Sequence, residues 1–324
     1  MSRAPELVAI GSGGTISAVA DAQRRSGDGL GVADIAGRAG ELPHGARVRP
    51  VDVRRIPGRA MGPAAMHEIA QAIAREVAAG CDGAIVTHGT DTVEETAYAL
   101  ALMLDVPVPV VLTAAMRLPE DPGADGPANV RGAIVAACDP RVAALGPVLA
   151  IQDELHLARW VTKAHTSRVA AFASPESGPV GALVEDRVEL LPCTRPDDFL
   201  GMPERLDGPR VELIAIAAGM DGLLVDAAAE QAAGIVVAGS GGGHTPPPVA
   251  AAIGRAIERG VPVVIASRCA AGPTLERTYG GEGGEIHLRS LGALFAGRIP
   301  PLKARLRLQV ALALGRRAAE VFPA

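Results

Sequence analysis

Residues 83–100 read GAIVTHGTDTVEETAYAL, and this stretch decides the fold. A short apolar run leads into Thr87-His88-Gly89-Thr90-Asp91-Thr92, and an Ala-, Glu- and Leu-rich helical pattern follows at once. The pattern predicts a buried strand, a tight turn and the start of a helix. In an open α/β sheet, ligands bind at the carboxyl ends of the strands, where helix N-termini present unpaired N–H groups. We therefore expect this turn to belong to a ligand site.

A second junction of the same kind opens the chain. Residues 7–10 form an aliphatic run that leads into GSGGTIS at 11–17, which places Thr15 just beyond the first strand. A glycine-rich turn alone is also typical of phosphate loops. This one lacks the P-loop lysine, and its glycines miss the spacing of a dinucleotide fingerprint.

The remaining pattern alternates strands with helices, which favours a parallel sheet with helices on both faces. Strands are expected at 6–10, 47–53, 83–87, 108–112 and 147–151, and helices at 63–79, 92–104 and 127–137. Segments 179–184 and 187–191 predict a hairpin. A second series has strands at 211–217, 234–237 and 261–266 and helices near 246–259 and 302–318.

The Pro-, Gly- and charge-rich segment 192–210 separates the two series. We therefore predict two α/β domains. The larger N-terminal parallel-sheet domain, 1–191, carries the threonines, 192–210 is the linker, and 211–324 is a smaller C-terminal α/β domain.

Composition excludes several classes of protein. Of the 324 residues 48% are hydrophobic but only 2% aromatic, so the core is aliphatic, and the net charge of −5 argues against nucleic-acid binding. The N-terminal apolar run is too short for a signal peptide, and no run reaches the ~18 residues of a membrane span. We expect a cytoplasmic protein. Four scattered cysteines and the absence of a Cys/His cluster predict reduced thiols, no catalytic metal and no cofactor.

The residues of the two turns have both chemical and structural interpretations. Thr15 is a candidate nucleophile that the glycines leave exposed to a cleft, although a threonine also caps the turn that follows it. Asp91 fits an N-cap with Glu94 at the third helical position. Capping leaves Thr90 and the Thr-His pair before it unexplained. Lys163 is either a solvated lysine or, among its small and apolar neighbours, a base with a lowered pKa.

Taken together, the two turns resemble those of the bacterial-type L-asparaginases, which carry a G-G-T-I turn and, later, a T-H-G-T-D-T turn. Residues 113–117 with 123–129, 171–181 and 303–308 resemble further segments of that family. The resemblance implies an amidohydrolase that converts L-asparagine to L-aspartate and ammonia through a threonine acyl-enzyme, with a weaker glutaminase activity. It assigns the catalytic roles to Thr15, Thr90, Asp91 and Lys163. The candidate binding residues for the amino-acid amide substrate are Gly14, Gly58, Arg59, Gly89, Ala115, Tyr279 and Glu282. The resemblance also implies a homodimer or homotetramer with active sites at the subunit interface.

The chain departs from the family pattern at three places. The loop 18–30 has no tyrosine to polarise Thr15, and we hypothesise that Tyr279 or Glu282 does so, from a partner subunit. Gly58 and Arg59 stand where the family has a serine, often followed by glutamine. Arg59 is either a bidentate clamp for the substrate carboxylate or a solvated side chain. Gly242 stands where the second domain of the family carries an amide side chain.

These departures leave other functions open. Hydrolysis of another small amide or a lactam is the alternative within the enzymes. A non-catalytic amino-acid-binding protein is the alternative outside them, although a sensor has no need of a nucleophile. The glycine-rich turn alone favours a nucleotide-binding dehydrogenase, which the rest of the sequence does not support.

Overall fold

The computed structural model describes residues 3–17, 32–37 and 40–322. The chain forms two compact units, Met1–Phe199 and Leu200–Ala324, and each is described by itself. Unit 1 contains an eight-stranded sheet with the strand order β10-β9-β6-β5-β4-β3-β1-β2. Its parallel part consists of β1 (Glu6–Gly11), β2 (Arg47–Asp52), β3 (Gly83–His88), β4 (Val110–Ala114) and β5 (Val148–Ile151).

The predicted parallel sheet continues into an antiparallel edge. β6 (Glu154–Leu157), β9 (Gly181–Val184) and β10 (Arg187–Leu190) run antiparallel to their neighbours. β9 and β10 form the predicted hairpin, whereas β6 was not anticipated. A separate ribbon pairs β7 (Thr162–Lys163) with β8 (Phe172–Ala173).

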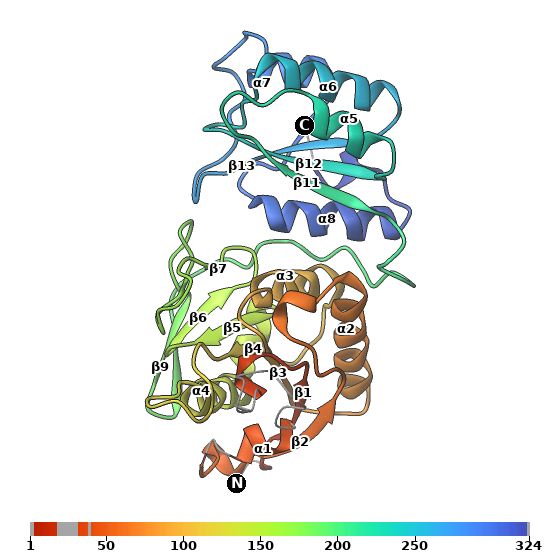
Figure 1. Ribbon diagram of the computed structural model, residues 1–324. Coiled ribbons are helices and arrows are strands. Elements are labelled where there is room, and N and C mark those ends of the chain that lie inside the picture. Colours follow the sequence, from red (N-terminus) through yellow and green to blue (C-terminus); the bar gives the residue numbers. More distant parts are fainter. Residues whose placement is uncertain (1–2, 18–31, 38–39, 323–324) are drawn as a thin grey trace. The chain divides into compact units, whose positions relative to one another are not determined.

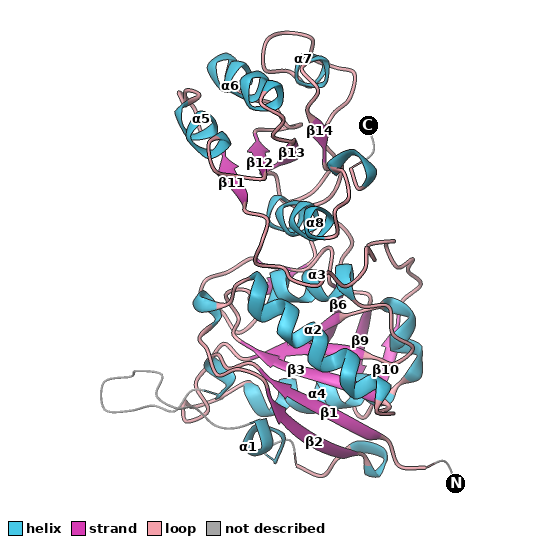
Figure 2. Ribbon diagram, turned by 90° about the vertical axis from the view of Figure 1, so that its right-hand side faces the viewer, coloured by secondary structure: helices cyan, strands magenta, loops and turns pink. Residues whose placement is uncertain are grey.

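Helices cover both faces of the parallel strands (Figures 1 and 2). α4 (Gly126–Cys138) and the short α1 (Val32–Gly37) lie on one face, and α2 (Pro63–Ala78) and α3 (Val93–Met103) lie on the other. β1, β3, β4 and β5 are therefore nearly continuous apolar runs, since side chains on both of their faces are buried, whereas the edge strand β2 is polar and at most half-buried. Short 3₁₀ helices occupy Thr15–Ser17, Pro43–Gly45, Gly58–Ala60 and Pro140–Leu145.

Unit 2 is a four-stranded parallel sheet of β11 (Val211–Ala215), β12 (Gly234–Gly239), β13 (Val263–Ser267) and β14 (Leu294–Phe295), in that order. Two apolar cores join the helices to this sheet. One contains residues of α5 (Leu223–Ala229), α6 (Pro247–Glu258) and α7 (Glu285–Ser290), and the other contains residues of α8 (Pro301–Ala313). α5, α7 and β14 were not anticipated.

The predicted strands and helices are confirmed to within a few residues at each end, except for the last helix, which is shorter than predicted. The helix expected at 302–318 ends at Ala313, and a separate 3₁₀ turn covers Ala318–Glu320. Gly315 adopts a left-handed conformation with φ of 71°, which terminates helices. In the described part of the chain, no helix combines the length and the apolar character that a membrane crossing requires.

Candidate active site

The two threonine turns lie side by side because their strands are neighbours. β1 pairs in parallel with β3, with Gly11 opposite Thr87. Beyond the ladder, the main-chain N–H and the hydroxyl of Ser12 both donate to the Thr87 carbonyl, at 3.1 and 2.8 Å. The carboxyl ends of both strands therefore open onto the same edge of the sheet, as the sequence predicts.

Three glycines bring the backbones of this edge into direct contact. A Cβ atom on Gly14 would lie 2.3 Å from the Cα of Gly89, and one on Gly89 would lie 2.8 Å from the Cα of Gly58. Gly14 also has a φ of 93°, which side-chain-bearing residues rarely adopt. Since no Cβ fits between these loops, the glycines set the distance between the two turns.

Lys163 joins the site from a distant part of the sequence. Its Nζ donates to Thr90 Oγ1 and to Asp91 Oδ1, both at 2.9 Å. The lysine side chain is 16% exposed and the Asp91 side chain 57%, so the ammonium group is shielded while the carboxylate faces solvent. Three of the four residues to which the resemblance assigns catalytic roles, Thr90, Asp91 and Lys163, are thus brought together and form a triad.

The main chain of Lys163 is fixed by Glu94, which the sequence pattern assigns to capping. Glu94, in the first turn of α3, is 7% exposed, and its Oε1 accepts a hydrogen bond from the Lys163 N–H at 3.1 Å. A cleft of about 420 Å³ lies beside this contact, lined by Asp91, Glu94, Lys163, Ala164, His165 and Thr166. Its volume falls in the usual range for small-molecule sites.

The predicted N-cap is wrong. The residue at the N-cap is Thr92 rather than Asp91, and its side chain makes no capping bond. The Thr92 hydroxyl instead donates to the Gly58 carbonyl at 2.7 Å, which ties the loop of Gly58 to the turn. The Asp91 carboxylate instead accepts the hydrogen bond from Lys163 Nζ at 2.9 Å.

His88 is buried under the same turn and was not assigned a role from sequence. Its Nδ1 lies 2.8 Å from the Gly89 carbonyl oxygen and its Nε2 lies 2.8 Å from Thr96 Oγ1. Burial lowers the pKa of His88 to about 4, so the ring is neutral at physiological pH. The sequence signal that could have indicated a role for His88 is its position directly before the Gly-Thr-Asp turn.

Thr15 begins the 3₁₀ helix Thr15–Ser17 and is half-buried. It follows Gly14, and Thr90 follows Gly89, so the two threonines flank the closest backbone contact of the site. The loop 18–30, which contains no tyrosine, lies outside the described residues. The structure thus places Thr15 at the predicted edge of the sheet.

The predicted substrate-binding residues fall into different environments. Gly58 is buried, whereas Arg59 is exposed in the 3₁₀ helix beside it. Ala115 is 1% exposed and follows β4. Its loop is held by Asp125, whose carboxylate accepts from the next two main-chain N–H groups at 2.9–3.2 Å.

Tyr279 and Glu282 belong to unit 2, in the glycine-rich loop before α7. Both are exposed, and the Tyr279 ring makes an edge contact with His244, with 4.8 Å between the ring centroids. The loop is anchored by the buried Glu285, which accepts from the Tyr279 N–H at 2.7 Å and contacts His244 Nε2 at 3.0 Å. Burial raises the pKa of Glu285, but these bonds outweigh it and leave the pKa below its ordinary value.

Gly242, at the position of the missing amide side chain, is enclosed. A Cβ there would lie 2.4 Å from Cγ of Leu275, whose N–H donates to the Gly242 carbonyl at 2.8 Å. An asparagine would therefore displace Leu275. The packing of unit 2 therefore requires the glycine that stands here in place of the family's amide side chain.

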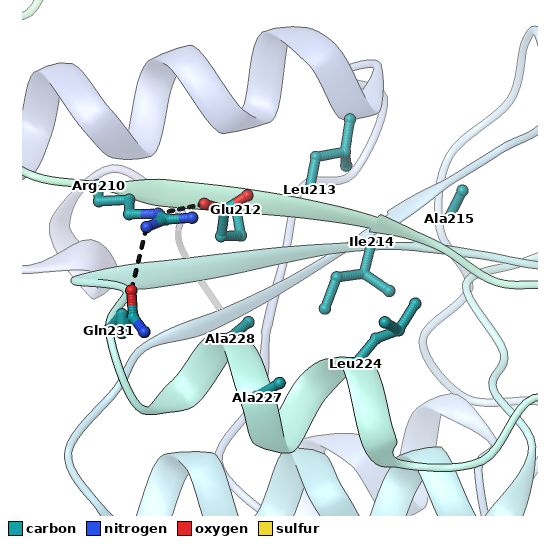
Figure 3. A pocket seen from close by; sticks show the side chains of 9 residues that line it. All are labelled: Arg210, Glu212, Leu213, Ile214, Ala215, Leu224, Ala227, Ala228 and Gln231. Carbon is teal, nitrogen blue, oxygen red and sulfur yellow. Dashed lines mark hydrogen bonds and ion pairs between the residues drawn. The ribbon is translucent and has the colours of Figure 1, made fainter.

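A second cavity, of about 390 Å³, lies in unit 2 between β11 and α5 (Figure 3). Its walls are mainly apolar, and its charged end holds Arg210, which bonds to Glu212 and to Gln231. None of the predicted catalytic residues lines it. Among the described residues, no group of three or more His, Cys, Asp or Glu side chains is arranged to hold a metal ion.

Comparison with known proteins gives one consistent family. The family model "Asparaginase, N-terminal" matches residues 6–193, and "Glutaminase/Asparaginase C-terminal domain" matches 210–322. A probable L-asparaginase of Deinococcus radiodurans is 37% identical over 96% of this chain and 94% of its own length. One subunit of the glutamyl-tRNA(Gln) amidotransferase of Halobacterium salinarum is 34% identical over 95% of this chain and 75% of its own length.

A solved structure shows the same fold. The probable cytoplasmic L-asparaginase of Campylobacter jejuni superposes with a TM-score of 0.86 at 28% identity, covering 98% of both chains. Both family models and a relative above 30% identity indicate the same family. The chain therefore belongs to the asparaginase family of amidohydrolases.

Proposed function

We propose that this enzyme hydrolyses L-asparagine to L-aspartate and ammonia through an ester on Thr15, with a minor activity on L-glutamine. The observation that carries the proposal is the pair of 2.9 Å hydrogen bonds from Lys163 to Thr90 and Asp91, beside the second threonine turn. Relatives named L-asparaginase support this substrate.

The proposed reaction has two halves. Thr15 Oγ1 attacks the side-chain amide carbon, and its proton is transferred as the C–O bond forms. The tetrahedral oxyanion collapses, the C–N bond breaks, and the protonated nitrogen leaves as ammonia. Water then attacks the ester, which releases aspartate and restores the Thr15 hydroxyl. Lys163 and Thr90 exchange the proton, while Asp91 stabilises the ammonium form of the lysine.

Backbone N–H groups of the two turns are the proposed donors to the oxyanion. The N–H of Thr90 and those of the Gly14 turn lie at the edge where the glycines meet. One such donor is typically worth about 3–4 kcal/mol of activation free energy. A rigid backbone contact suits this role because the donors need no rearrangement during the reaction.

Two exposed charges, one of them from the triad itself, are proposed to bind the amino-acid end of the substrate. The solvent-facing carboxylate of Asp91 suits the α-ammonium group, and the exposed guanidinium of Arg59 suits the α-carboxylate. An Arg59→Ala variant is expected to raise KM with little change in kcat. An unaltered KM would remove Arg59 from the site.

Tyr279 or Glu282 of a partner subunit is proposed to activate Thr15. Tyr279→Phe and Glu282→Ala separate the two, because only the variant that removes the activating group lowers kcat. An unchanged kcat in both variants would refute the proposal.

Hydrolysis of a different small amide is the second candidate, and Gly242 favours it. The position that carries an amide side chain in the family is closed here, because a Cβ on Gly242 would lie 2.4 Å from Cγ of Leu275. A substrate contact of the family is therefore missing. Turnover of short amides that lack the α-ammonium group, at rates above that of L-asparagine, would support this candidate.

We further propose a cytoplasmic homodimer or homotetramer. The structural relative from Campylobacter jejuni is named a probable cytoplasmic L-asparaginase. Two adjacent leucines of α5, Leu223 and Leu224, are 68% and 53% exposed, which supports self-association. Light scattering at micromolar concentration tests this, and a monomer there would contradict it.

The deciding experiment measures ammonia release from L-asparagine, L-glutamine and D-asparagine at neutral pH, with Thr15→Ala as the control. Release from L-asparagine that disappears in the variant is the expected result. Binding of L-asparagine without release would instead identify a silent amino-acid-binding protein.

A further inference from the structure

The peptide that joins Gly89 to Thr90 is held from beneath by His88. The ring is 0% exposed, and both of its nitrogens have partners at 2.8 Å, the Gly89 carbonyl and the Thr96 hydroxyl. A carbonyl can only accept, so Nδ1 carries the proton and donates to Gly89. Nε2 is then an acceptor, and the Thr96 hydroxyl donates to it.

Thr96 supplies the donor that the Nδ1–H tautomer requires at Nε2. It lies on α3, is 0% exposed, and approaches the ring from the helix side. Without its hydroxyl, Nε2 would be a buried acceptor with no donor, and the ring would lose one of the two contacts that hold it against the Gly89 carbonyl.

The direction of this carbonyl fixes the direction of the Thr90 N–H. In a trans peptide the C=O and the N–H point to opposite sides of the chain. A peptide that follows a glycine turns over easily, because glycine has few steric restrictions on ψ. With the carbonyl held by buried His88, the N–H of Thr90 must point away from the core.

We propose that His88 and Thr96 are positioning residues that aim the Thr90 N–H at the oxyanion. This inference rests on the proposed function, in which that N–H is a donor to the tetrahedral intermediate. It assigns no contact with substrate to either side chain. His88 acts through the Gly89–Thr90 peptide, and Thr96 acts through His88.

The test compares three variants. Thr96→Val removes the hydroxyl at nearly constant volume, and Thr96→Ser restores it. Thr113→Val is the matched control, because Thr113 is also 0% exposed and donates at 2.8 Å to a backbone carbonyl, that of Ala150. If Thr96→Val is insoluble, Thr96→Ala removes the same hydroxyl with less bulk.

We expect Thr96→Val to lower kcat for L-asparagine by at least about tenfold, part of the roughly 100-fold effect of a lost oxyanion donor, with KM nearly unchanged. Thr96→Ser is expected to recover most of kcat, and Thr113→Val to keep the wild-type kcat. A kcat for Thr96→Val as high as that of the control would overturn the proposal.

A crystal structure of Thr96→Val provides a readout that does not need activity. The expected result is a Gly89–Thr90 peptide that has turned over or lost its contact with His88. An unmoved peptide would overturn the proposal even where kcat falls. Failure of the proposed function is seen separately, as wild-type enzyme that releases no ammonia, and the crystal structure still decides the positioning role in that case.

Discussion

Replacing Lys163 by methionine separates the chemistry of the site from its structural support. The variant keeps the aliphatic stem of the lysine and the main-chain bond from residue 163 to Glu94. It loses the Nζ atom, and with it the two 2.9 Å bonds to Thr90 and Asp91. Any loss of activity is then assigned to the ammonium group rather than to the backbone of β7.

The expected loss of stability is small. Asp91 is 57% exposed, so its ion pair is worth at most about 1 kcal/mol, and the buried Thr90 hydroxyl loses one partner, worth about 1 kcal/mol. The sum of about 2 kcal/mol is below the usual 5–15 kcal/mol of folding free energy. Loss of a general base, in contrast, lowers kcat by about 10²–10⁴, or about 3–5 kcal/mol of activation free energy.

The assay is ammonia release under saturating substrate, with urea unfolding of the same preparations. Arg255→Met is the control, because it removes an ion pair to Asp226 in unit 2, where both side chains are at least 36% exposed. The control is expected to keep both activity and stability. If Lys163→Met retained kcat within tenfold of wild type, the role assigned to the lysine would be refuted.

Three further predictions use other parts of unit 1. Gly14→Ala is expected to lower the free energy of unfolding by more than about 2 kcal/mol, because its Cβ would lie 2.3 Å from Gly89 Cα at a φ of 93°. Thermal unfolding that matches wild type would contradict this. His88 has a pKa of about 4 when folded against 6.5 when unfolded, so the unfolded chain binds more protons between these values. As the pH falls from 6.5 to about 4, this group is expected to lower stability by at most about 1.4 kcal/mol per pH unit, as urea titrations at several pH values would show. Burial raises the pKa of Cys138 to about 11, whereas Cys193 is exposed, so brief alkylation should label Cys193 first in peptide mapping; equal labelling would argue against this order.

The sequence predicts the parallel half of the sheet well because each unit there is local. β3, its turn and α3 combine an apolar run, polar turn residues and a helical pattern within twenty-one positions. β6 was missed for an equally local reason. β6 follows β5 through a two-residue turn, Gln152 and Asp153, with φ of 56° and 62°. Neither residue is a glycine, which is the usual sequence signal for such a tight hairpin turn.

The site was only partly predictable. Thr15 and Thr90 follow from the strand ends, but the approach of Lys163 depends on the pairing of β7 with β8, which no nearby residue indicates. Glu94 was read as a capping residue because its spacing from Asp91 fits that motif. The actual acceptor role, toward the Lys163 N–H at 3.1 Å, connects residues 69 positions apart and has no local signature.

The packing also explains why the departures from the family pattern collect where they do. The triad is held by groups that constrain one another. Glu94 fixes the lysine backbone, the lysine fixes Asp91, and Gly89 cannot accept a Cβ. Arg59 is exposed and takes no part in these contacts. Gly242 lies in unit 2, where Leu275 leaves no room for a larger side chain. The residues at positions 59 and 242 can therefore change without moving the threonine turns. The fold thus constrains the residues that carry out amide hydrolysis more strongly than the residues that select the amide substrate.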